Sequence, residues 1–364
     1  MKVLSIICVA KLGIRPYTLR NKNTDKKMEK KNPSPSMELS YLRMMKLPLL
    51  FLSFILHIGC NNIKTSPDQK DKPATLVSET FLVVLGTIQD AGSPHIACKK
   101  ACCAPLFGKP NSLRKVVSLG VVDPQNDISF LFEATPDITS QLKSLKQFSN
   151  SEKELPDGIF LSHAHIGHYT GLMYLGKEAT NASQVPVYAM PRMKTFLENN
   201  GPWSQLVSSN NIALNEIEDQ KEITLSSNLK VIPFSVPHRD EFSETVGFKI
   251  IGPKKSVLFI PDIDKWEKWE TDISELISQV DYAFVDATFF DGDEINSRDI
   301  SEIPHPFIIE SLALFKRLPA EEKQKIHFIH FNHTNPALNP ESDAFEAVYE
   351  NGFNLAQIHM VIPL

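Results

Sequence analysis

Three histidines, His163, His165 and His168, lie within six residues directly after the apolar run 158–161 (GIFL). An apolar run of this kind predicts a buried strand, and the spacing H-x-H-x-x-H puts three imidazoles just past its end. Imidazole is the commonest protein ligand for zinc and related ions. The pattern therefore predicts a metal site at the edge of a sheet. The alternative is a solvated histidine cluster in a loop.

Further candidate ligands follow other predicted strands, because one short loop cannot surround an ion. Each follows a run rich in β-branched or aromatic residues: His238, Asp262, His330 and His333. A single His or Asp after a strand is more often a cap or a surface group. Several such positions in one chain indicate that the strand ends meet at a common centre.

Hydrophobic runs and helical periodicity predict the other elements of the chain. Besides the strands before the candidate ligands, we expect strands at 81–86, 116–122, 128–133, 185–189, 245–251 and 282–286. Helical periodicity is found at 138–148, 190–199, 266–280, 306–318 and 340–351.

Residues 86–94 (GTIQDAGSP), the cysteine cluster that follows them and residues 330–336 (HFNHTNP) complete the set of motifs. Together with the ligand order H-x-H-x-x-H, His, Asp, His, they resemble the metallo-β-lactamase-fold hydrolases. Within that superfamily they are similar to the pyrroloquinoline quinone biosynthesis protein B group. The resemblance covers residues 80–364. It implies an α/β fold, a four-layer αββα sandwich with one or two metals between the sheet edges.

The resemblance also implies which residues bind each metal. The first metal would take His163, His165 and His238; the second would take His168 and His330, with Asp262 bridging both. A single metal at the three-histidine position is the alternative. Zinc suits these ligands, and so do iron and manganese.

Gly167 departs from the superfamily pattern H-x-H-x-D-H, in which an aspartate stands at this position. In related hydrolases that carboxylate binds the second metal and holds the attacking water, so its absence weakens both roles. A glycine in a turn more often provides a positive φ, or it makes room for substrate. We therefore expect Gly167→Asp to cost activity rather than to tighten the second metal.

Cys98, Cys102 and Cys103 lie within six residues, too close together to pair off as ordinary structural disulfides. Three soft ligands in one loop predict a zinc site with a fourth ligand from elsewhere. The resemblance implies a structural zinc completed by His333, with His330 in the catalytic centre; the reverse assignment is the alternative. The spacing C-x-x-x-C-C differs from the family's C-x-C-x-x-C. A disulfide plus one free thiol is the other interpretation.

The apolar run 47–56 follows Met44, Met45 and Lys46 and ends shortly before Cys60. This order is typical of a bacterial lipoprotein signal, and the run is shorter than the ~20 residues that span a bilayer. We expect Cys60 to carry a lipid that anchors the protein in the bacterial cell envelope, facing the periplasm or the exterior.

The chain then divides into three parts. Residues 1–59 are the predicted leader and signal segment, with Met44 or Met45 as the expected true start. Residues 60–79 are polar and contain proline, which predicts a flexible tether. Residues 80–364 are the expected metallo-β-lactamase-like catalytic domain.

The charge balance argues against nucleic acid as a partner. Residues 1–59 hold 11 of the 38 basic residues and 3 of the 43 acidic ones, so the rest of the chain has a formal net charge of −13. A body this acidic repels phosphate backbones. The substrate expected from this balance is a small molecule.

Two more residues are candidates for the catalytic set beside Asp262. Asp286 follows a predicted strand and resembles an acidic residue that orients a metal-binding histidine in the tRNA-processing branch of the fold. His305 precedes a predicted helix, where it could contact substrate or donate a proton. For both, the alternative is a cap or a structural group.

The function expected from these residues is hydrolysis of an ester, lactone, amide or phosphodiester by metal-activated water. A histidine-rich site with open positions also suits an iron-dependent oxidative enzyme, as has been proposed for the quinone-biosynthesis relatives. A non-catalytic lipoprotein that binds a ligand or a metal is the third possibility, because Gly167 removes a carboxylate.

Overall fold

The computed structural model describes residues 78–295 and 299–364. The chain divides into two compact units, Met1–Ser66 and Pro67–Leu364, and the described residues belong to the second. The predicted leader, its start codon, Cys60 and nearly all of the tether lie outside them. Among the described residues, no helix combines the length and the apolar character needed to cross a membrane.

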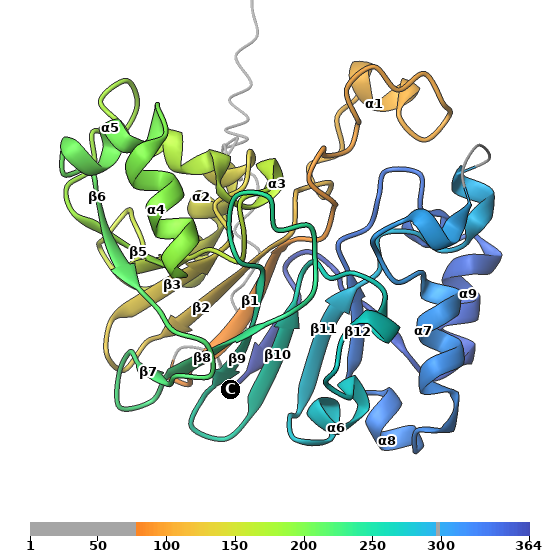
Figure 1. Ribbon diagram of the computed structural model, residues 1–364. Helices are drawn as coiled ribbons and strands as arrows, with labels where there is room; N and C mark the ends of the chain where they lie inside the picture. The colour runs from red at the N-terminus through yellow and green to blue at the C-terminus, as the bar shows by residue number, and fades with distance from the viewer. Residues whose placement is uncertain (1–77, 296–298) are drawn as a thin grey trace, which may run out of the picture. The chain divides into compact units, whose positions relative to one another are not determined.

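Two mixed β-sheets form the centre of this unit (Figure 1). The first sheet has the strand order β14 (Val361–Pro363), β1 (Phe81–Gly86), β2 (Ser118–Asp123), β3 (Ile128–Phe132), β4 (Gly158–Phe160), β5 (Val185–Ala189) and β6 (Ile212–Glu216). The second has the order β13 (Asn354–Leu355), β12 (Ile326–Ile329), β11 (Tyr282–Asp286), β10 (Ser256–Ile260), β9 (Val246–Ile251), β8 (Lys230–Ser235) and β7 (Ile223–Thr224).

Helices cover the outer face of each sheet, so both sheets are buried on two sides. Over the first sheet lie α2 (Ile138–Phe148), α4 (Pro191–Asn199) and α5 (Trp203–Ser208); over the second lie α6 (Ile273–Ser278), α7 (Ile308–Leu314), α8 (Ala320–Lys323) and α9 (Asp343–Glu350). The short helices α1 (Ala104–Gly108) and α3 (Ile166–Tyr169) lie in loops beside the sheets.

The buried side chains form three clusters that correspond to the three gaps between these layers. A central cluster, which includes Phe132, Phe248 and Phe259, joins the two sheets, and each outer cluster joins one sheet to its helices. In α2 the buried residues Ile138, Gln141 and Leu145 share one face, as helical periodicity requires. The four-layer αββα sandwich predicted from the sequence is confirmed.

Most predicted elements are found with similar bounds, but one predicted helix is interrupted. Residues 266–280 form a 3₁₀ turn, Trp266–Lys268, followed by α6. The Asp272 side chain accepts a hydrogen bond from the Ser274 amide and starts α6 as its N-cap. A capping aspartate in a helical pattern ends one segment and begins another.

Candidate metal centre

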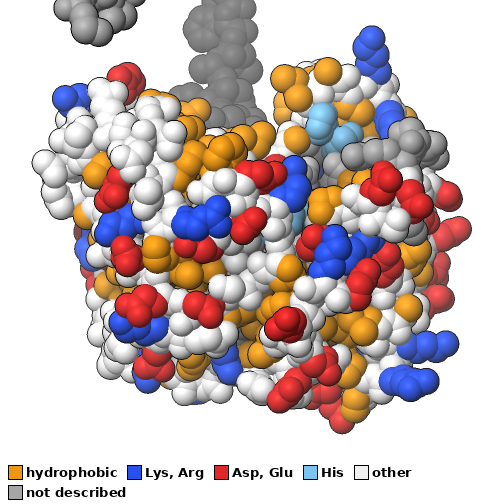
Figure 2. All heavy atoms as spheres, viewed as in Figure 1, with side chains coloured by type: hydrophobic (Ala, Val, Ile, Leu, Met, Phe, Trp, Pro, Cys, Tyr) orange, Lys and Arg blue, Asp and Glu red, His pale blue; other side chains and the backbone are white. Residues whose placement is uncertain are grey.

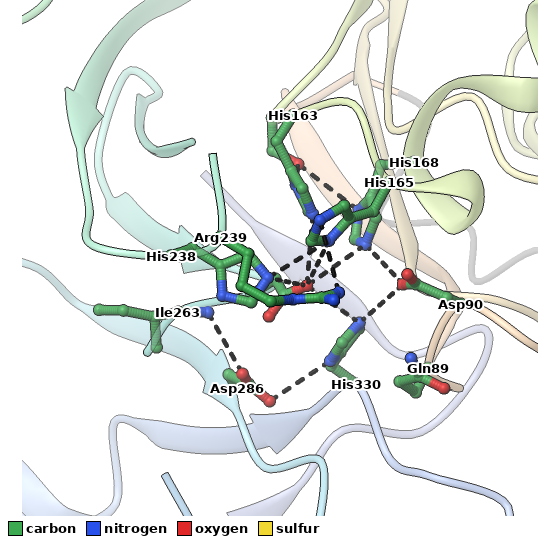
Figure 3. A network of polar contacts seen from close by, with 12 residues as sticks. Gln89, Asp90, His163, His165, His168, His238, Arg239, Ile263, Asp286 and His330 are labelled. Carbon is green, nitrogen blue, oxygen red and sulfur yellow. Dashed lines mark hydrogen bonds and ion pairs between the residues drawn. The ribbon is translucent and has the colours of Figure 1, made fainter. Parts of the chain in front are cut away.

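The Asp262 carboxylate, just after β10, lies where the candidate ligands meet. Its Oδ2 atom is 3.1 Å from Nε2 of His238 and 3.3 Å from Nε2 of His163. Ring nitrogens of three more histidines lie at 3.9–4.0 Å from the same oxygen: His165, His168 and His330. Figure 3 shows the five imidazoles pointing toward one another, three from the segment after β4 and one each from the loops that carry His238 and His330. The structure thus brings these six predicted residues together.

The first group of ligand atoms belongs to His163, His165, His238 and Asp262, and these atoms all lie within 4.8 Å of one another. The Ser162 hydroxyl lies 2.9 Å from Nδ1 of His163 and holds that ring in place. The opposite nitrogen, Nε2, is buried and makes no hydrogen bond.

The second group contains Asp90, His168, Asp262 and His330. Asp90 Oδ1 lies 2.8 Å from Nε2 of His168 and 3.3 Å from Nε2 of His330. On the other side of the His168 ring, Glu133 Oε2 lies 3.3 Å from Nδ1. Neither Asp90 nor Glu133 is among the site residues predicted from the sequence.

Two residues of this region have a backbone conformation that favours glycine. Glu133 follows β3 with φ 74° and His330 follows β12 with φ 68°. Such a conformation costs a non-glycine residue about 1 kcal/mol or more and persists where the surroundings impose it. Here the backbone at the two strand ends places the Glu133 carboxylate beside His168 and the His330 imidazole in the centre.

Asp286, the last residue of β11, connects the second group to its surroundings. Its Oδ1 accepts hydrogen bonds from the Thr288 amide and hydroxyl and lies 3.3 Å from Nδ1 of His330. Its Oδ2 accepts from the Ile263 amide and from Nδ1 of His305. Asp286 is therefore both a turn cap and a partner of a candidate ligand.

His305 lies between two carboxylates. Its Nδ1 atom is 2.9 Å from Asp286 Oδ2 and 3.1 Å from Asp262 Oδ1. Burial lowers the pKa of this imidazole, but the two carboxylates outweigh it and raise the pKa to about 10. The position suits a residue that orients Asp262.

The electrostatics of the centre fit a cation. Burial favours the neutral form of Asp262, yet the imidazoles of His238, His305 and His330 hold its pKa well below the usual range. Five imidazoles around one carboxylate oxygen either repel one another as cations or leave lone pairs facing an anion. A metal ion between them relieves both conflicts, and Nε2 of His163, which makes no hydrogen bond, would be one of its ligands.

Some side chains of the centre are partly exposed to solvent. The side chains of His163, His168, His238 and His330 are at most 1% exposed, whereas those of His165, Asp90 and His305 are 11–13% exposed. Ile166, next to His165 in the sequence, is more than half exposed. So is Phe242, which follows Glu241, the carboxylate that contacts the His165 ring. Exposed hydrophobic side chains therefore lie beside the partly exposed His165.

Gly167 lies in α3 with a backbone that any residue can adopt, so it does not provide a positive φ. A Cβ at this position would lie 2.5 Å from the Asp90 Cα and 2.6 Å from its Oδ1. The space beside Gly167 is therefore filled by Asp90 and is not open to substrate.

The cysteine cluster forms a separate group of potential ligands. Cys98, Cys102, Cys103 and His333 have ligand atoms within 4.8 Å of one another, and the three cysteines are free. The His95 ring lies against that of His333, with ring centres 4.4 Å apart. Burial, with the nearby His95 and Lys100, lowers the pKa of His333 to about 4, which keeps its imidazole neutral, as a metal ligand requires.

Comparisons with known proteins agree with this architecture. The model of a family described as β-lactamase superfamily domain matches residues 129–328. Among curated proteins, coenzyme PQQ synthesis protein B of Methylococcus capsulatus is 26% identical over 303 residues, which cover 75% of this chain and 96% of the relative. The protein of the same name from Methylorubrum extorquens strain PA1 is 23% identical and covers 78% and 99%.

Solved structures show the same fold. Zn²⁺-bound PqqB from Methylobacterium extorquens superposes with a TM-score of 0.65 at 21% identity, covering 78% of this chain and 100% of that one. A diphosphatase from the PhnP family superposes with a TM-score of 0.56 at 21% identity, covering 79% and 97%. The resemblance to metallo-β-lactamase-fold, PqqB-like proteins is confirmed.

The relatives correct the expected localisation. Proteins named for coenzyme PQQ synthesis match this chain along 96% to 99% of their own length, and these matches cover 75% to 78% of it. These relatives contradict the prediction of an envelope protein anchored by a lipid on Cys60.

Proposed function

The chain belongs to the β-lactamase superfamily domain family, and from this premise we propose that it is a metal-dependent hydrolase of a small molecule. The observation that carries the proposal is the buried Asp262 Oδ2 with nitrogens of five imidazoles within 4.0 Å. A buried charge needs a compensating partner, and this set of nitrogen and oxygen donors is one that transition metals accept.

The residues that would hold the metals follow from the two groups. His163, His165 and His238 would bind the first ion, His168 and His330 the second, and Asp262 both. Zinc is the metal we propose, since the solved PqqB structure is Zn²⁺-bound. When bound, such ions lower the pKa of a coordinated water and polarise the oxygen of a substrate.

The surrounding residues orient these ligands. Asp286 holds His330 through Nδ1, and Glu133 holds His168 in the same way. His305, within hydrogen-bond distance of Asp262 Oδ1, fixes the carboxylate that both ions would share. Partners of this kind keep ligand rings in the required orientation. We propose Asp286 and His305 as positioning residues for the centre.

The substrate classes that this centre could cleave are esters, lactones, amides and phosphodiesters. The net charge of −13 outside residues 1–59 argues against a polyanion, since a polyanion is bound by a basic surface. Figure 2 shows Lys and Arg side chains scattered among Asp and Glu over the viewed face of the described residues. We propose a small molecule without an extended phosphate backbone.

A second candidate, oxidation with bound iron, is supported by the donors around His330. Two imidazoles and two carboxylates suit iron or manganese as well as zinc, and the curated relatives are named for synthesis of coenzyme PQQ.

One experiment separates the two candidates. The full chain, loaded with zinc, manganese or iron, is assayed on chromogenic esters, lactones and phosphodiesters, with oxygen uptake followed in parallel. We expect hydrolysis without oxygen uptake, reduced by at least ~100-fold in Asp262→Asn. The matched control is Asp240→Asn, whose exposed carboxylate pairs with Arg192. Substrate-dependent oxygen uptake by the iron form, with no hydrolysis, would favour the oxidative enzyme.

For the cysteine cluster we propose a structural zinc bound by Cys98, Cys102, Cys103 and His333. What supports it is the closeness of three free thiols and an imidazole. Three sulfurs and one nitrogen are a common closed zinc site. His330 belongs to the other centre, because its Nε2 faces Asp90 and Asp262.

A further inference from the structure

Asp90 reaches the metal centre from a loop that the proposed ligand set does not include. It follows β1 by four residues, and its side chain is almost fully buried. Figure 3 shows its carboxylate directed at His168 and His330. A buried carboxylate with two imidazole partners calls for an explanation, because burial without a cation is costly.

The geometry around Asp90 is that of a ligand. Its Oδ1 lies 2.8 Å and 3.3 Å from the Nε2 atoms of His168 and His330, the same two atoms that lie 3.9 Å and 4.0 Å from Asp262 Oδ2. Two carboxylate oxygens and two nitrogens thus surround a common point. Without Asp90, only three of these four donors would remain.

The loop that carries Asp90 is tied to the loop that carries His330. The Gln89 amide donates to the Phe331 carbonyl, and the Phe331 amide donates to the Thr87 carbonyl. Ile88 forms β-bridges to both Val116 and Phe331. These backbone hydrogen bonds join the two loops directly, so they fix the positions of Asp90 and His330 relative to each other.

Gly167 provides the space for Asp90. Three atoms of Asp90 lie within 2.9 Å of the position that a Cβ on residue 167 would take, the Cα among them. Since φ at this glycine is ordinary, close approach is what requires the absence of a side chain. The glycine and the aspartate are therefore a complementary pair.

We propose that Asp90 is a ligand of the second metal and that Gly167 is a glycine in order to admit it. The inference rests on the proposed metal centre and completes its second position with a carboxylate supplied by the loop after β1. The second metal then has four protein ligands: Asp90, His168, Asp262 and His330.

The test measures metal binding rather than turnover. The full chain is stripped and titrated with zinc, and zinc per chain is measured by elemental analysis, for the wild type and Asp90→Asn. The amide has nearly the same shape but is a much poorer ligand. We expect Asp90→Asn to lower the zinc affinity of one site by more than ~100-fold, the loss typical when a hydrogen-bond partner of a metal ligand is removed. Zinc binding at the remaining sites should be unchanged. Asp90→Ala, which only removes atoms, takes its place if Asp90→Asn does not fold.

Asp240→Asn is the matched control, because Asp240 is an exposed carboxylate that pairs with Arg192 near the same centre. It should bind zinc as the wild type does. If Asp90→Asn also keeps every zinc with affinity within about threefold of the wild type, Asp90 is only a hydrogen-bond partner of His168 and the inference is overturned.

The outcomes separate this inference from the proposed function. If Asp90→Asn loses zinc but the wild type hydrolyses no substrate, the ligand assignment is supported and the hydrolase proposal is contradicted. If the wild type is a hydrolase but Asp90→Asn keeps its zinc, the hydrolase proposal is supported and the ligand assignment is contradicted. A wild type that binds no zinc outside the cysteine cluster overturns both.

Discussion

At the scale of single residues, the centre is organised by carboxylates that each contact two or more histidines. Asp262 faces five imidazoles through one oxygen, and Asp286 holds both His305 and His330. The histidines and Asp262 could be predicted because each follows a strand in a known order. Asp90 could not be predicted, because its position depends on Gly167, 77 positions away. In the motif alone, Gly167 shows only that the usual aspartate is missing.

Glu294, whose hydrogen bonds come from Phe290 and Thr334 and not from a proposed metal ligand, gives a test of the electrostatics. Burial raises the pKa of Glu294 to about 7 from 4.5, although hydrogen bonds from Thr334 and the Phe290 amide oppose the shift. Because the folded pKa lies above the unfolded one, the stability that this carboxyl contributes is present below pH 4.5 and is lost as the pH rises through about 7.

Glu294→Gln, which stays neutral, should therefore gain stability relative to the wild type between pH 5 and pH 8. We expect a change on the order of 1 kcal/mol, reduced by the partial exposure of the side chain. Thermal unfolding of both proteins across this range measures it, with the exposed Asp293→Asn as control. An equal difference between variant and wild type at pH 5 and pH 8 would show that the carboxyl is not perturbed.

At the scale of elements, strands deliver the ligands and their ends set the geometry. The runs 185–189 and 282–286 became strands with the predicted bounds, because continuous apolar or alternating patterns are strong signals. The helix expected at 266–280 is not continuous, because Asp272 caps the start of a new helix within it. The path of residues 87–94 depends on bridges to Val116 and Phe331, which local patterns do not encode.

The end of β1 tests how firmly that path is held. A Cβ on Gly86 would lie 1.9 Å from the Val116 carbonyl oxygen, a backbone atom that cannot rotate away. We expect Gly86→Ala to cost about 3 kcal/mol, seen as a fall in Tm of at least ~5 °C, and to reduce zinc binding because Asp90 moves. Gly108→Ala, at an exposed position with no heavy atom within 4 Å of the added Cβ, is the control. Equal Tm values for the two variants would argue against the close approach.

At the scale of the whole molecule, the centre lies where the ends of the two sheets meet. The first sheet supplies His163, His165 and His168 after β4 and Asp90 after β1; the second supplies His238, Asp262 and His330. The aromatic cluster between the sheets fixes one half against the other. Metals bound across this junction would stabilise the folded state by mass action, so chelation should lower the Tm of the full chain.

The most direct test of the central claim is the metal content of three full-length proteins, measured by elemental analysis after removal of loosely bound ions. We expect the wild type to carry zinc in two kinds of site. His163→Ala combined with His165→Ala should lose metal from the histidine centre, and Cys103→Ser should lose only the metal of the cysteine cluster. Metal content in the double histidine variant equal to that of the wild type would contradict the existence of the metal centre.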